Sequence, residues 1–201
     1  MTSAVLTGCT GSGKTTFGQL IAMEAAFPFV EEPESSNPFL TDSYLRPEIF
    51  GLRSQVSFML GFLDAQLSWR GDVLQERCIS DCLYVFSRIL LHRQAISARD
   101  YKLLEQLHDR LIDLSPNTVD AFVFLECPVG VTLERITRRG REFETRIDEQ
   151  FLLLQTEFYE EWLLNRVKLP VYRVSNEGSI DDLRQKAAAV AEFLRALKSA
   201  A

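Results

Sequence analysis

The sequence predicts an α/β fold in which a five-stranded parallel sheet is flanked by helices. Short apolar runs alternate with longer segments of helical spacing along the chain, and a glycine-rich turn directly follows the first apolar run. Strands that alternate with helices pair in parallel through right-handed crossovers. The chain has 201 residues, of which 46% are hydrophobic, so we expect one domain over residues 1–201 with a sizeable core.

Five apolar runs are the expected strands, and they lie at 4–7, 27–30, 73–75, 121–125 and 171–174. Apolar residues recur at helical spacing between them, which predicts helices at 15–26, 47–69, 82–92, 101–114, 129–139 and 143–169. A last helix is expected from an N-cap at Ser179 to about Lys198. The polar stretch 35–43 is expected to be a loop, and Pro116-Asn117 a turn.

The glycine-rich turn carries the strongest functional signal in the chain. Its residues, Gly8-Cys9-Thr10-Gly11-Ser12-Gly13-Lys14-Thr15, fit the pattern G-x-x-x-x-G-K-[ST], the P-loop. In such a turn the backbone N–H groups point at phosphate oxygens, the lysine reaches the β- and γ-phosphates, and the threonine hydroxyl holds Mg²⁺. The N-terminus of the following helix adds a partial positive charge. We therefore expect Mg²⁺ at Thr15 and nucleotide phosphates at Gly8, Thr10, Gly11, Ser12, Gly13, Lys14, Thr15 and Thr16.

Composition and charge exclude several other classes of protein. The formal net charge of −6 argues against nucleic acid as a main partner. No stretch approaches about 18 consecutive apolar residues, and the first residues lack the basic region of a signal peptide, so we expect neither a membrane span nor secretion. The four cysteines form no Cys-x-x-Cys pair, which favours buried thiols in a reducing cytoplasm.

Charged residues follow two of the expected strands. Glu31-Glu32 comes after the second strand and Glu76-Arg77 after the third, at the edge where open α/β sheets bind ligands. Glu32 is thus a candidate general base, although an acidic, solvated loop explains the same position equally well. Gln55 is a long polar residue inside an apolar helix, and it either bonds a ligand or faces solvent.

Four arginines lie close together at the end of the expected helix 129–139. Arg135, Arg138, Arg139 and Arg141 surround Gly140, and basic residues before a glycine are typical of an ordinary helix C-terminus. Four arginines within seven positions exceed that need. They also fit a lid that closes on phosphates.

Four separated segments share their order and spacing with one known family. They are the P-loop at 8–15, Glu-Pro followed by Asn-Pro-Phe-Leu at 32–40, Glu76-Arg77 opening a run to Phe86, and Arg135-x-x-x-Arg139-Gly-Arg141 followed by Glu144. Over about residues 1–175 the chain resembles the deoxynucleoside kinases, including the short bacterial deoxyadenosine/deoxyguanosine kinases. The resemblance implies a P-loop kinase fold with an Arg-rich lid at about 135–146. It also implies an enzyme that uses ATP and Mg²⁺ to phosphorylate the 5′-hydroxyl of a deoxynucleoside.

The resemblance further implies roles for individual residues. Glu32 would be the general base facing the 5′-hydroxyl, Arg77 would hold that hydroxyl and the transferred phosphoryl group, and Lys14 would reach the donor phosphates. Glu76 would lie near the Mg²⁺. The nucleoside would contact Tyr44 and Glu144 at its 3′-hydroxyl, Gln55 at the base edge, Phe86 as a stacking partner, and Phe58, Phe62 and Cys82 as pocket walls, while Arg135, Arg139 and Arg141 would form the lid.

Two positions depart from the family's pattern and leave the preferred base open. Members of the family that accept deoxycytidine and purines usually carry an Arg seven residues after the Gln and an Asp six residues after the Glu. This chain has Phe62 and Cys82 there, and Asp81 is one residue out of register. Apolar residues there resemble the broad or pyrimidine-accepting branch, whereas the short chain and Asn-Pro-Phe-Leu resemble the bacterial purine branch. An apolar wall leaves no buried polar group unsatisfied when another base enters. We therefore expect broad specificity, with deoxyadenosine or a pyrimidine deoxynucleoside preferred over deoxyguanosine.

Two other functions remain open from the residues alone. One is a P-loop kinase for a nucleoside monophosphate or another small alcohol, which Glu32 disfavours because a monophosphate acceptor favours an Arg at that position. The other is a regulatory P-loop NTPase, which the lack of Asn-Lys-x-Asp and Asp-x-x-Gly motifs disfavours. The resemblance also implies a homodimer.

Overall fold

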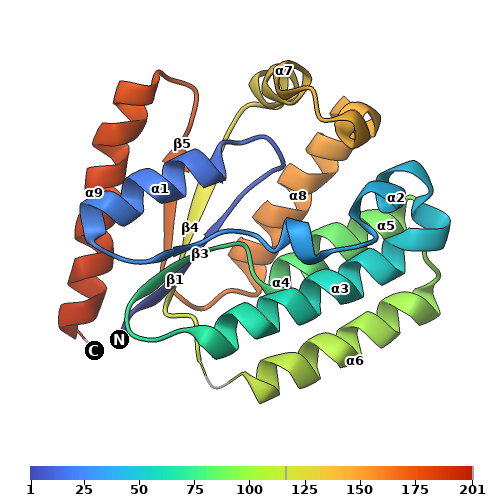
Figure 1. Cartoon of the computed structure of the whole chain (residues 1–201), viewed down its shortest axis with the longest axis horizontal. Helices are drawn as coiled ribbons and strands as arrows, with labels where there is room; N and C mark the ends of the chain where they lie inside the picture. Colours follow the sequence, from blue (N-terminus) through green and yellow to red (C-terminus); the bar gives the residue numbers. More distant parts are fainter. Residues whose placement is uncertain (116, 201) are drawn as a thin grey trace.

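A parallel sheet forms the centre of the computed structural model, which describes residues 1–115 and 117–200 of the chain. The sheet has five strands in the order β2-β3-β1-β4-β5 (Figure 1), and neighbouring strands are parallel. The strands are β1 (Ser3–Thr7), β2 (Phe29–Val30), β3 (Val73–Glu76), β4 (Ala121–Glu126) and β5 (Val171–Ser175). Each overlaps an expected apolar run, so the predicted α/β fold is confirmed.

The longer helices also lie where the apolar periodicity predicts them. They are α1 (Lys14–Ala25), α3 (Pro47–Ser68), α6 (Ala98–Leu114), α7 (Val129–Arg139), α8 (Glu149–Asn165) and α9 (Ile180–Ala200). The hydroxyl of Ser179 accepts from the N–H of Asp182 at 3.3 Å, which confirms the expected cap of α9.

The expectation of a loop at 35–43 is wrong. This part of the chain contains a short 3₁₀ turn, η1 (Glu34–Ser36), and a helix, α2 (Leu40–Leu45). Asn37 explains the turn between them, because its side-chain oxygen accepts from the N–H of Phe39 at 3.0 Å while its amide donates to the Ser54 hydroxyl of α3 at 3.0 Å. The Asn-Pro sequence therefore marks a turn fixed against α3.

Two expected helix boundaries also differ from the structure. The helix expected from residue 82 begins earlier and runs through α4 (Ile79–Asp81), the π-helical η2 (Cys82–Ser87) and α5 (Arg88–His92), because the carboxylate of Asp81 caps it at the N–H of Cys78, 2.9 Å away. The expected helix 143–169 is divided into a 3₁₀ turn, η3 (Glu142–Arg146), and α8, which Asp148 caps at the N–H of Phe151, 2.7 Å away. Of the expected turn Pro116-Asn117, Pro116 lies outside the described residues.

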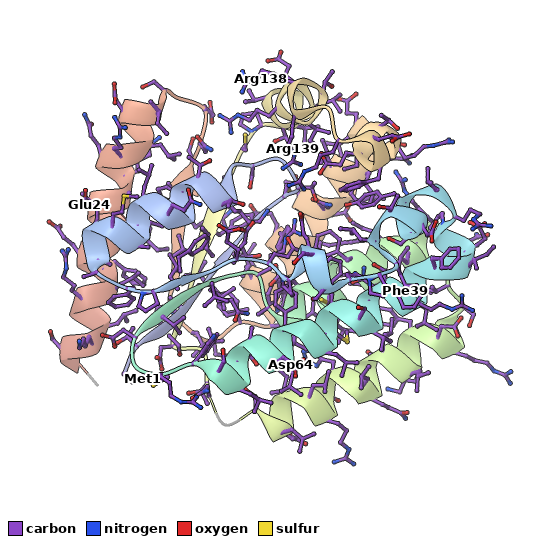
Figure 2. The ribbon with its side chains drawn as sticks, in the orientation of Figure 1. Met1, Glu24, Phe39, Asp64, Arg138 and Arg139 are labelled. Atoms are coloured by element: carbon purple, nitrogen blue, oxygen red, sulfur yellow. The ribbon has the colours of Figure 1, made fainter. Side chains whose placement is uncertain are left out.

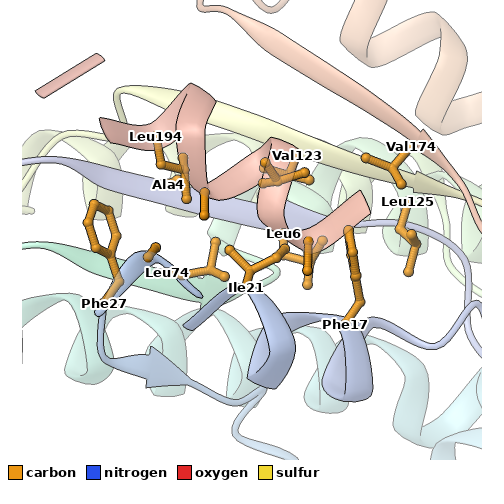
Figure 3. Close-up of a cluster of buried hydrophobic side chains, with 14 of the residues drawn as sticks. Ala4, Leu6, Phe17, Ile21, Phe27, Leu74, Val123, Leu125, Val174 and Leu194 are labelled. Carbon is orange, nitrogen blue, oxygen red and sulfur yellow. The ribbon is translucent and has the colours of Figure 1, made fainter. Parts of the chain in front are cut away.

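Alternate residues of the central strands face two different helical layers. On β1, Ala4 and Leu6 belong to a cluster with α1 and α9, whereas Val5 belongs to a cluster with α8. Figure 3 shows the first cluster, in which Phe17 of α1 and Leu194 of α9 pack beside strand residues. In Figure 1, α1 and α9 lie on one side of the sheet, and α8 with α3 to α6 on the other. A parallel sheet buried on both faces requires this arrangement.

The parallel strands place their carboxyl ends at one edge of the sheet. The P-loop follows β1, Glu31 and Glu32 follow β2, Arg77 follows β3, and Asn176 follows β5. Ligands bind at this edge in open parallel sheets. Among the described residues, none of the helices is long and apolar enough to cross a membrane.

Candidate active site

The P-loop, residues 8–15, joins β1 to α1 through backbone conformations that glycine adopts most easily. Gly8 has a φ of +150° and Gly13 a φ of +97°. A Cβ at Gly8 would lie 2.5 Å from the carbonyl oxygen of Leu125, so no larger residue fits beside β4. Gly13 directly precedes Lys14, the first residue of α1, and the helix N-terminus therefore faces the turn. The turn therefore lies at the positive end of the α1 dipole, which favours an anion.

Lys14 and Glu76 form a buried ion pair beside Thr15. The Nζ of Lys14 lies 3.8 Å from Oε1 of Glu76, and the Thr15 hydroxyl donates to Oε2 of Glu76 at 2.9 Å. Burial is the main cause that lowers the pKa of Lys14, with the nearby Arg77 second, and burial also raises the pKa of Glu76. The attraction between the two side chains opposes both shifts. This pair keeps a cation and carboxylate oxygens together at the start of α1.

Arg77 has a strained backbone immediately after β3. Its φ is +58°, a left-handed conformation that non-glycine residues rarely adopt. Its N–H donates to the carbonyl of Leu6 at 2.9 Å, and the amide of Gln75 donates to its carbonyl at 2.8 Å. Its Nη1 donates to both oxygens of Glu32, at 2.8 and 2.7 Å. The neighbouring strands thus hold a costly conformation that directs the guanidinium at Glu32.

The buried guanidinium of Arg77 keeps one donor unused. Its Nε has no hydrogen-bond partner within residues 1–115 and 117–200. Its carbon Cζ lies 4.6 Å from the centre of the Phe86 ring, so the aromatic face covers one side of the charge. An unpaired buried donor costs free energy, which an anionic ligand would offset by accepting from it.

Asp81 stabilises the turn that carries Arg77. Its carboxylate is fully buried and accepts from the N–H of Cys78 at 2.9 Å, from the Tyr159 hydroxyl at 2.8 Å and from the Thr7 hydroxyl. Burial raises the pKa of this carboxyl group. Asp81, which is one residue out of the family's register, therefore joins β1 and α8 to the start of α4.

A cavity of about 980 Å³ joins the P-loop to a pocket on α3 and η2. Gln55, Phe58 and Phe62 line the pocket from α3, and Cys82 and Phe86 line it from η2. The Oε1 of Gln55 is buried and has no hydrogen-bond partner in the described part of the chain. Phe58, Phe62, Cys82 and Phe86 are apolar, whereas Ser54 and Asp81 also line the cavity. A few polar groups on a mostly apolar wall are usual for a pocket that binds a small organic ligand.

Two arginines at the end of α7, Arg139 and Arg141, are paired with carboxylates. Arg139 donates to both oxygens of Glu144, at 3.0 Å from Nε and 2.5 Å from Nη2. Arg141 donates to Glu34 at 2.9 Å. Figure 2 shows Arg138 and Arg139 at the upper edge of the molecule, where α7 ends. Both arginines therefore have carboxylate partners in this structure.

Tyr44 and Glu144, the predicted partners of the 3′-hydroxyl, line the same cavity. The ring of Tyr44 lies 5.4 Å from that of Phe143, centre to centre, and Glu144 is 3% exposed. Burial raises the pKa of the Tyr44 hydroxyl, so it remains a donor at neutral pH. A hydroxyl donor and a carboxylate acceptor are the complement of a sugar hydroxyl.

Arg135 lies against the P-loop, apart from the other predicted lid arginines. Its Nη1 donates to the carbonyl of Ser12 at 3.1 Å and to the Sγ of Cys127 at 3.3 Å. Asn176 donates to the same Ser12 carbonyl at 2.6 Å. Sequence reasoning missed Asn176, although its place directly after a strand was a usable signal.

Gln155 of α8 is a second residue that sequence reasoning missed. It is fully buried, and its amide contacts Thr10 of the P-loop through both its oxygen and its nitrogen. The sequence does contain a signal for Gln155, which directly follows Leu152-Leu153-Leu154. A single amide residue in an apolar helix is also the feature that makes Gln55 a candidate.

The cavity brings together most of the predicted site residues. Gly8 and Ser12 are outside its lining: Gly8 packs beside β4, and the Ser12 hydroxyl is fully buried. The predicted residues that line it are Thr10, Gly11, Gly13, Lys14, Thr15, Thr16, Glu32, Tyr44, Gln55, Phe58, Phe62, Glu76, Arg77, Cys82, Phe86, Arg135, Arg139, Arg141 and Glu144.

The residues at the P-loop fit a nucleoside triphosphate and its magnesium ion. The Ser12 hydroxyl is buried without a partner among the residues that the structure describes, in a loop that presents N–H groups to an anion. Thr15 and Glu76 supply the hard oxygen atoms that Mg²⁺ prefers. Within the described ranges no group of three or more His, Cys, Asp or Glu side chains is placed to hold a metal. The metal would therefore complete its coordination with phosphate oxygens and water.

A family model described as deoxynucleoside kinase matches residues 5–199 of the chain. The chain belongs to the deoxynucleoside kinase family. This confirms the family that the four sequence segments predict, and with it the prediction that the protein is a phosphotransferase.

The relatives of this kinase are named for deoxynucleosides with different bases. It is 24% identical over 196 residues to a deoxyadenosine/deoxycytidine kinase of Bacillus subtilis (strain 168), which covers 91% of this chain and 90% of the relative. It is 23% identical over 148 residues to a deoxyguanosine kinase of the same organism, covering 72% and 70%. The structure of a deoxyadenosine kinase from M. mycoides, which contains dCMP and dCDP, superposes with a TM-score of 0.81 over 99% of this chain and 100% of that chain, at 18% identity. This likeness shows that the kinase has the same fold.

Proposed function

We propose that this kinase transfers the γ-phosphoryl group of ATP to the 5′-hydroxyl of a deoxynucleoside and releases a deoxynucleoside 5′-monophosphate. The observation that carries the proposal is the shared cavity, which has the P-loop, the Arg77–Glu32 pair and the Gln55 pocket on its walls. A triphosphate donor and a nucleoside acceptor would meet in this one space. The names of the Bacillus relatives support a deoxynucleoside as acceptor.

In the proposed reaction Glu32 accepts the proton of the 5′-hydroxyl while that oxygen bonds to the γ-phosphorus. The bond between the γ-phosphorus and the bridging oxygen breaks, and ADP leaves. Lys14 and Arg77 offset the negative charge on the transferred oxygens, and the unpaired Nε of Arg77 supports this role. Thr15 and Glu76 would hold Mg²⁺, which neutralises donor phosphates when bound.

The other P-loop and lid residues would bind the donor. Phosphate oxygens would accept from backbone N–H groups of the loop and from Thr16. Arg135 lies at the loop already, and Arg139 and Arg141 would join it after leaving Glu144 and Glu34. Charge-assisted, bidentate contacts suit arginine to this task.

The nucleoside would lie in the pocket on α3 and η2. The unpaired Oε1 of Gln55 would accept from an amino or ring N–H group of the base. Phe86 would stack on the base, Phe58, Phe62 and Cys82 would wall the pocket, and Tyr44 and Glu144 would bond the 3′-hydroxyl. Because Phe62 and Cys82 carry no charge, we infer broad base specificity, with deoxyadenosine or a pyrimidine deoxynucleoside preferred over deoxyguanosine.

We also infer that the chain forms one domain with a lid at about 135–146, and that it works as a homodimer in the cytoplasm. A single sheet and a family match over residues 5–199 support one domain. Exposed leucines on α3 and α6, such as Leu60, Leu67 and Leu103, support a partner surface. The cysteines are free thiols, which supports a reducing compartment.

Incubation of the purified enzyme with ATP, Mg²⁺ and each of the four deoxynucleosides tests this function. We expect a nucleoside 5′-monophosphate and ADP in equal amounts, identified by mass spectrometry. Parallel reactions with nucleoside monophosphates as acceptors separate this function from its nearest alternative. ADP formation without nucleoside phosphorylation, or a product from monophosphates alone, would refute the proposal.

A further inference from the structure

Thr10 of the P-loop is the meeting point of two buried side chains from distant parts of the sequence. The Oε1 of Gln155 on α8 accepts from the backbone N–H of Thr10 at 2.8 Å, and its Nε2 donates to the Thr10 hydroxyl oxygen at 3.1 Å. The Nη2 of Arg77 donates to the same hydroxyl oxygen at 3.3 Å. Gln155 is fully buried, and Thr10 and Arg77 are 7% and 6% exposed.

The chemistry of the groups fixes the direction of these hydrogen bonds. A backbone N–H can only donate, so the Gln155 atom facing it must be the amide oxygen, and the amide nitrogen must face the hydroxyl. The guanidinium of Arg77 can also only donate. The hydroxyl oxygen of Thr10 therefore accepts from two donors, which use both of its lone pairs. Its own hydrogen atom is left for a third group, and no acceptor of it is found among residues 1–115 and 117–200.

Thr10 lines the cavity together with Lys14 and Arg77, where the proposed reaction moves a phosphoryl group. An anionic phosphoryl oxygen is a strong acceptor for a hydroxyl group. We propose that the Thr10 hydroxyl donates a hydrogen bond to the transferred phosphoryl group, and that Gln155 is the positioning residue that directs it there. The inference rests on the proposed phosphoryl transfer and adds a side-chain donor to the backbone N–H groups of the P-loop.

Gln155 sets the direction because only its amide group offers an acceptor to the Thr10 N–H and a donor to the Thr10 hydroxyl at once. A glutamate at 155 has the same shape but, when ionised, only acceptors. The Thr10 hydroxyl would then donate to residue 155 and turn its hydrogen away from the cavity. Thr10 would still accept from Arg77 and would still donate its N–H to residue 155. Gln155→Glu therefore reverses one hydrogen bond, and it also adds a buried negative charge, whose effect Thr10→Val does not share.

The experiment compares Thr10→Val, Thr10→Ser and Gln155→Glu with a matched control on the same helix. Thr156 follows Gln155, and its hydroxyl lies 3.4 Å from the Sγ of Cys9 in the same loop but outside the active-site cavity, so Thr156→Val is that control. Thermal midpoints verify folding. The rate and KM values are measured with ATP, Mg²⁺ and the best deoxynucleoside at pH 8.5. Assembly of the complex with ADP, nucleoside and aluminium fluoride is measured as a mimic of the transition state.

We expect Thr10→Val and Gln155→Glu to lower kcat about 10–100-fold, with KM for both substrates within about threefold, because the lost bond is strongest to the charge of the transition state. Both should weaken the aluminium fluoride complex by a similar factor. Thr10→Ser keeps the hydroxyl and should stay within about fivefold of the parent, and Thr156→Val within about twofold.

An unchanged kcat in either Thr10→Val or Gln155→Glu would overturn the inference, and the result for Gln155→Glu does so even if Thr10→Val does not fold. A similar loss in Thr10→Val, which adds no charge, assigns the effect to the hydrogen bond and not to the added carboxylate. A loss seen only as a higher KM for ATP would also overturn it, because Thr10 would then serve ground-state binding. A parent enzyme that phosphorylates no deoxynucleoside would overturn the proposed function itself. The parent and variant assays therefore separate the two failures.

Discussion

The two ends of the active-site cavity are built in different ways. The P-loop end comes from one continuous stretch, residues 8–15, which joins β1 to α1. Its charged neighbours are already paired, Lys14 with Glu76 and Arg77 with Glu32. The nucleoside end is made by side chains of α3 and η2, with apolar walls and one unpaired amide oxygen at Gln55.

Because the two ends differ in this way, mutations in them should change different kinetic properties. Phosphoryl transfer depends on placing charge against charge, so changes at the P-loop end should lower kcat. Nucleoside selection depends on shape and on a few hydrogen bonds, so changes at the other end should alter KM and base preference.

Glu32→Gln tests the junction of the two ends. It keeps the shape of the side chain, and its amide oxygen still accepts from Arg77, but it takes no proton from the 5′-hydroxyl. We expect kcat to fall by about 10²–10⁴-fold with little change in nucleoside affinity. Steady-state kinetics with calorimetric nucleoside binding measure both. Collapse of binding with a normal kcat would assign Glu32 to substrate binding.

Lys14→Ala tests the charged end alone. The change removes one positive charge from the donor phosphates and leaves Glu76 without its partner. We expect kcat to fall by about 10²-fold or more while the chain still folds. Circular dichroism controls for folding, and a normal kcat would mean that the loop does not hold the donor.

The P-loop end could be predicted from the sequence because its residues are consecutive in the chain. A glycine pattern after an apolar run defines the turn, and Glu32 and Arg77 follow strands at the edge where ligands bind. The strained φ of Arg77 could not be predicted, because its N–H donates to Leu6, a contact that exists only after β1 and β3 pair.

The contacts that join distant segments were the hardest to predict. Gln155 reaches Thr10 across 145 positions and Asn176 reaches Ser12 across 164, so no local pattern connects them. The pairing of Arg141 with Glu34 spans 107 positions in the same way. The sequence predicts a lid for Arg139 and Arg141 but does not reveal their carboxylate partners.

Glu144→Ala tests the sugar-binding part of the nucleoside end. A site that bonds the 3′-hydroxyl discriminates against its loss, so dideoxynucleosides should be poor substrates of the parent enzyme. Removal of the Glu144 carboxylate should narrow the deoxy/dideoxy ratio of kcat/KM by about tenfold. The change also leaves Arg139 without its carboxylate partner, which can alter the absolute rate. The ratio of kcat/KM for the two sugars is therefore the quantity to compare. Equal rates with both sugars in the parent would refute the pairing of Tyr44 and Glu144.

The double change Phe62→Arg with Cys82→Asp tests the wall of the base pocket. Both residues are buried, at 1% and 2% exposure, and line the cavity. The new Arg–Asp pair adds charged groups that can bond the polar edge of cytosine or guanine, and it occupies space that thymine needs. We expect use of deoxycytidine or deoxyguanosine to rise about fivefold relative to thymidine, in competition at equal concentrations. A parent enzyme strictly specific for deoxyguanosine would contradict this view of the pocket.

Gln55→Leu, followed by two binding measurements, tests the division between the two ends most directly. The change removes the unpaired amide of the nucleoside end and leaves every P-loop contact in place. Calorimetry should show deoxynucleoside affinity weakened by about tenfold, the value of one lost hydrogen bond. The affinity for a non-hydrolysable ATP analogue should stay within about twofold of the parent, because its contacts lie at the P-loop. Equal weakening of both ligands, or unchanged binding of the nucleoside, would contradict the account.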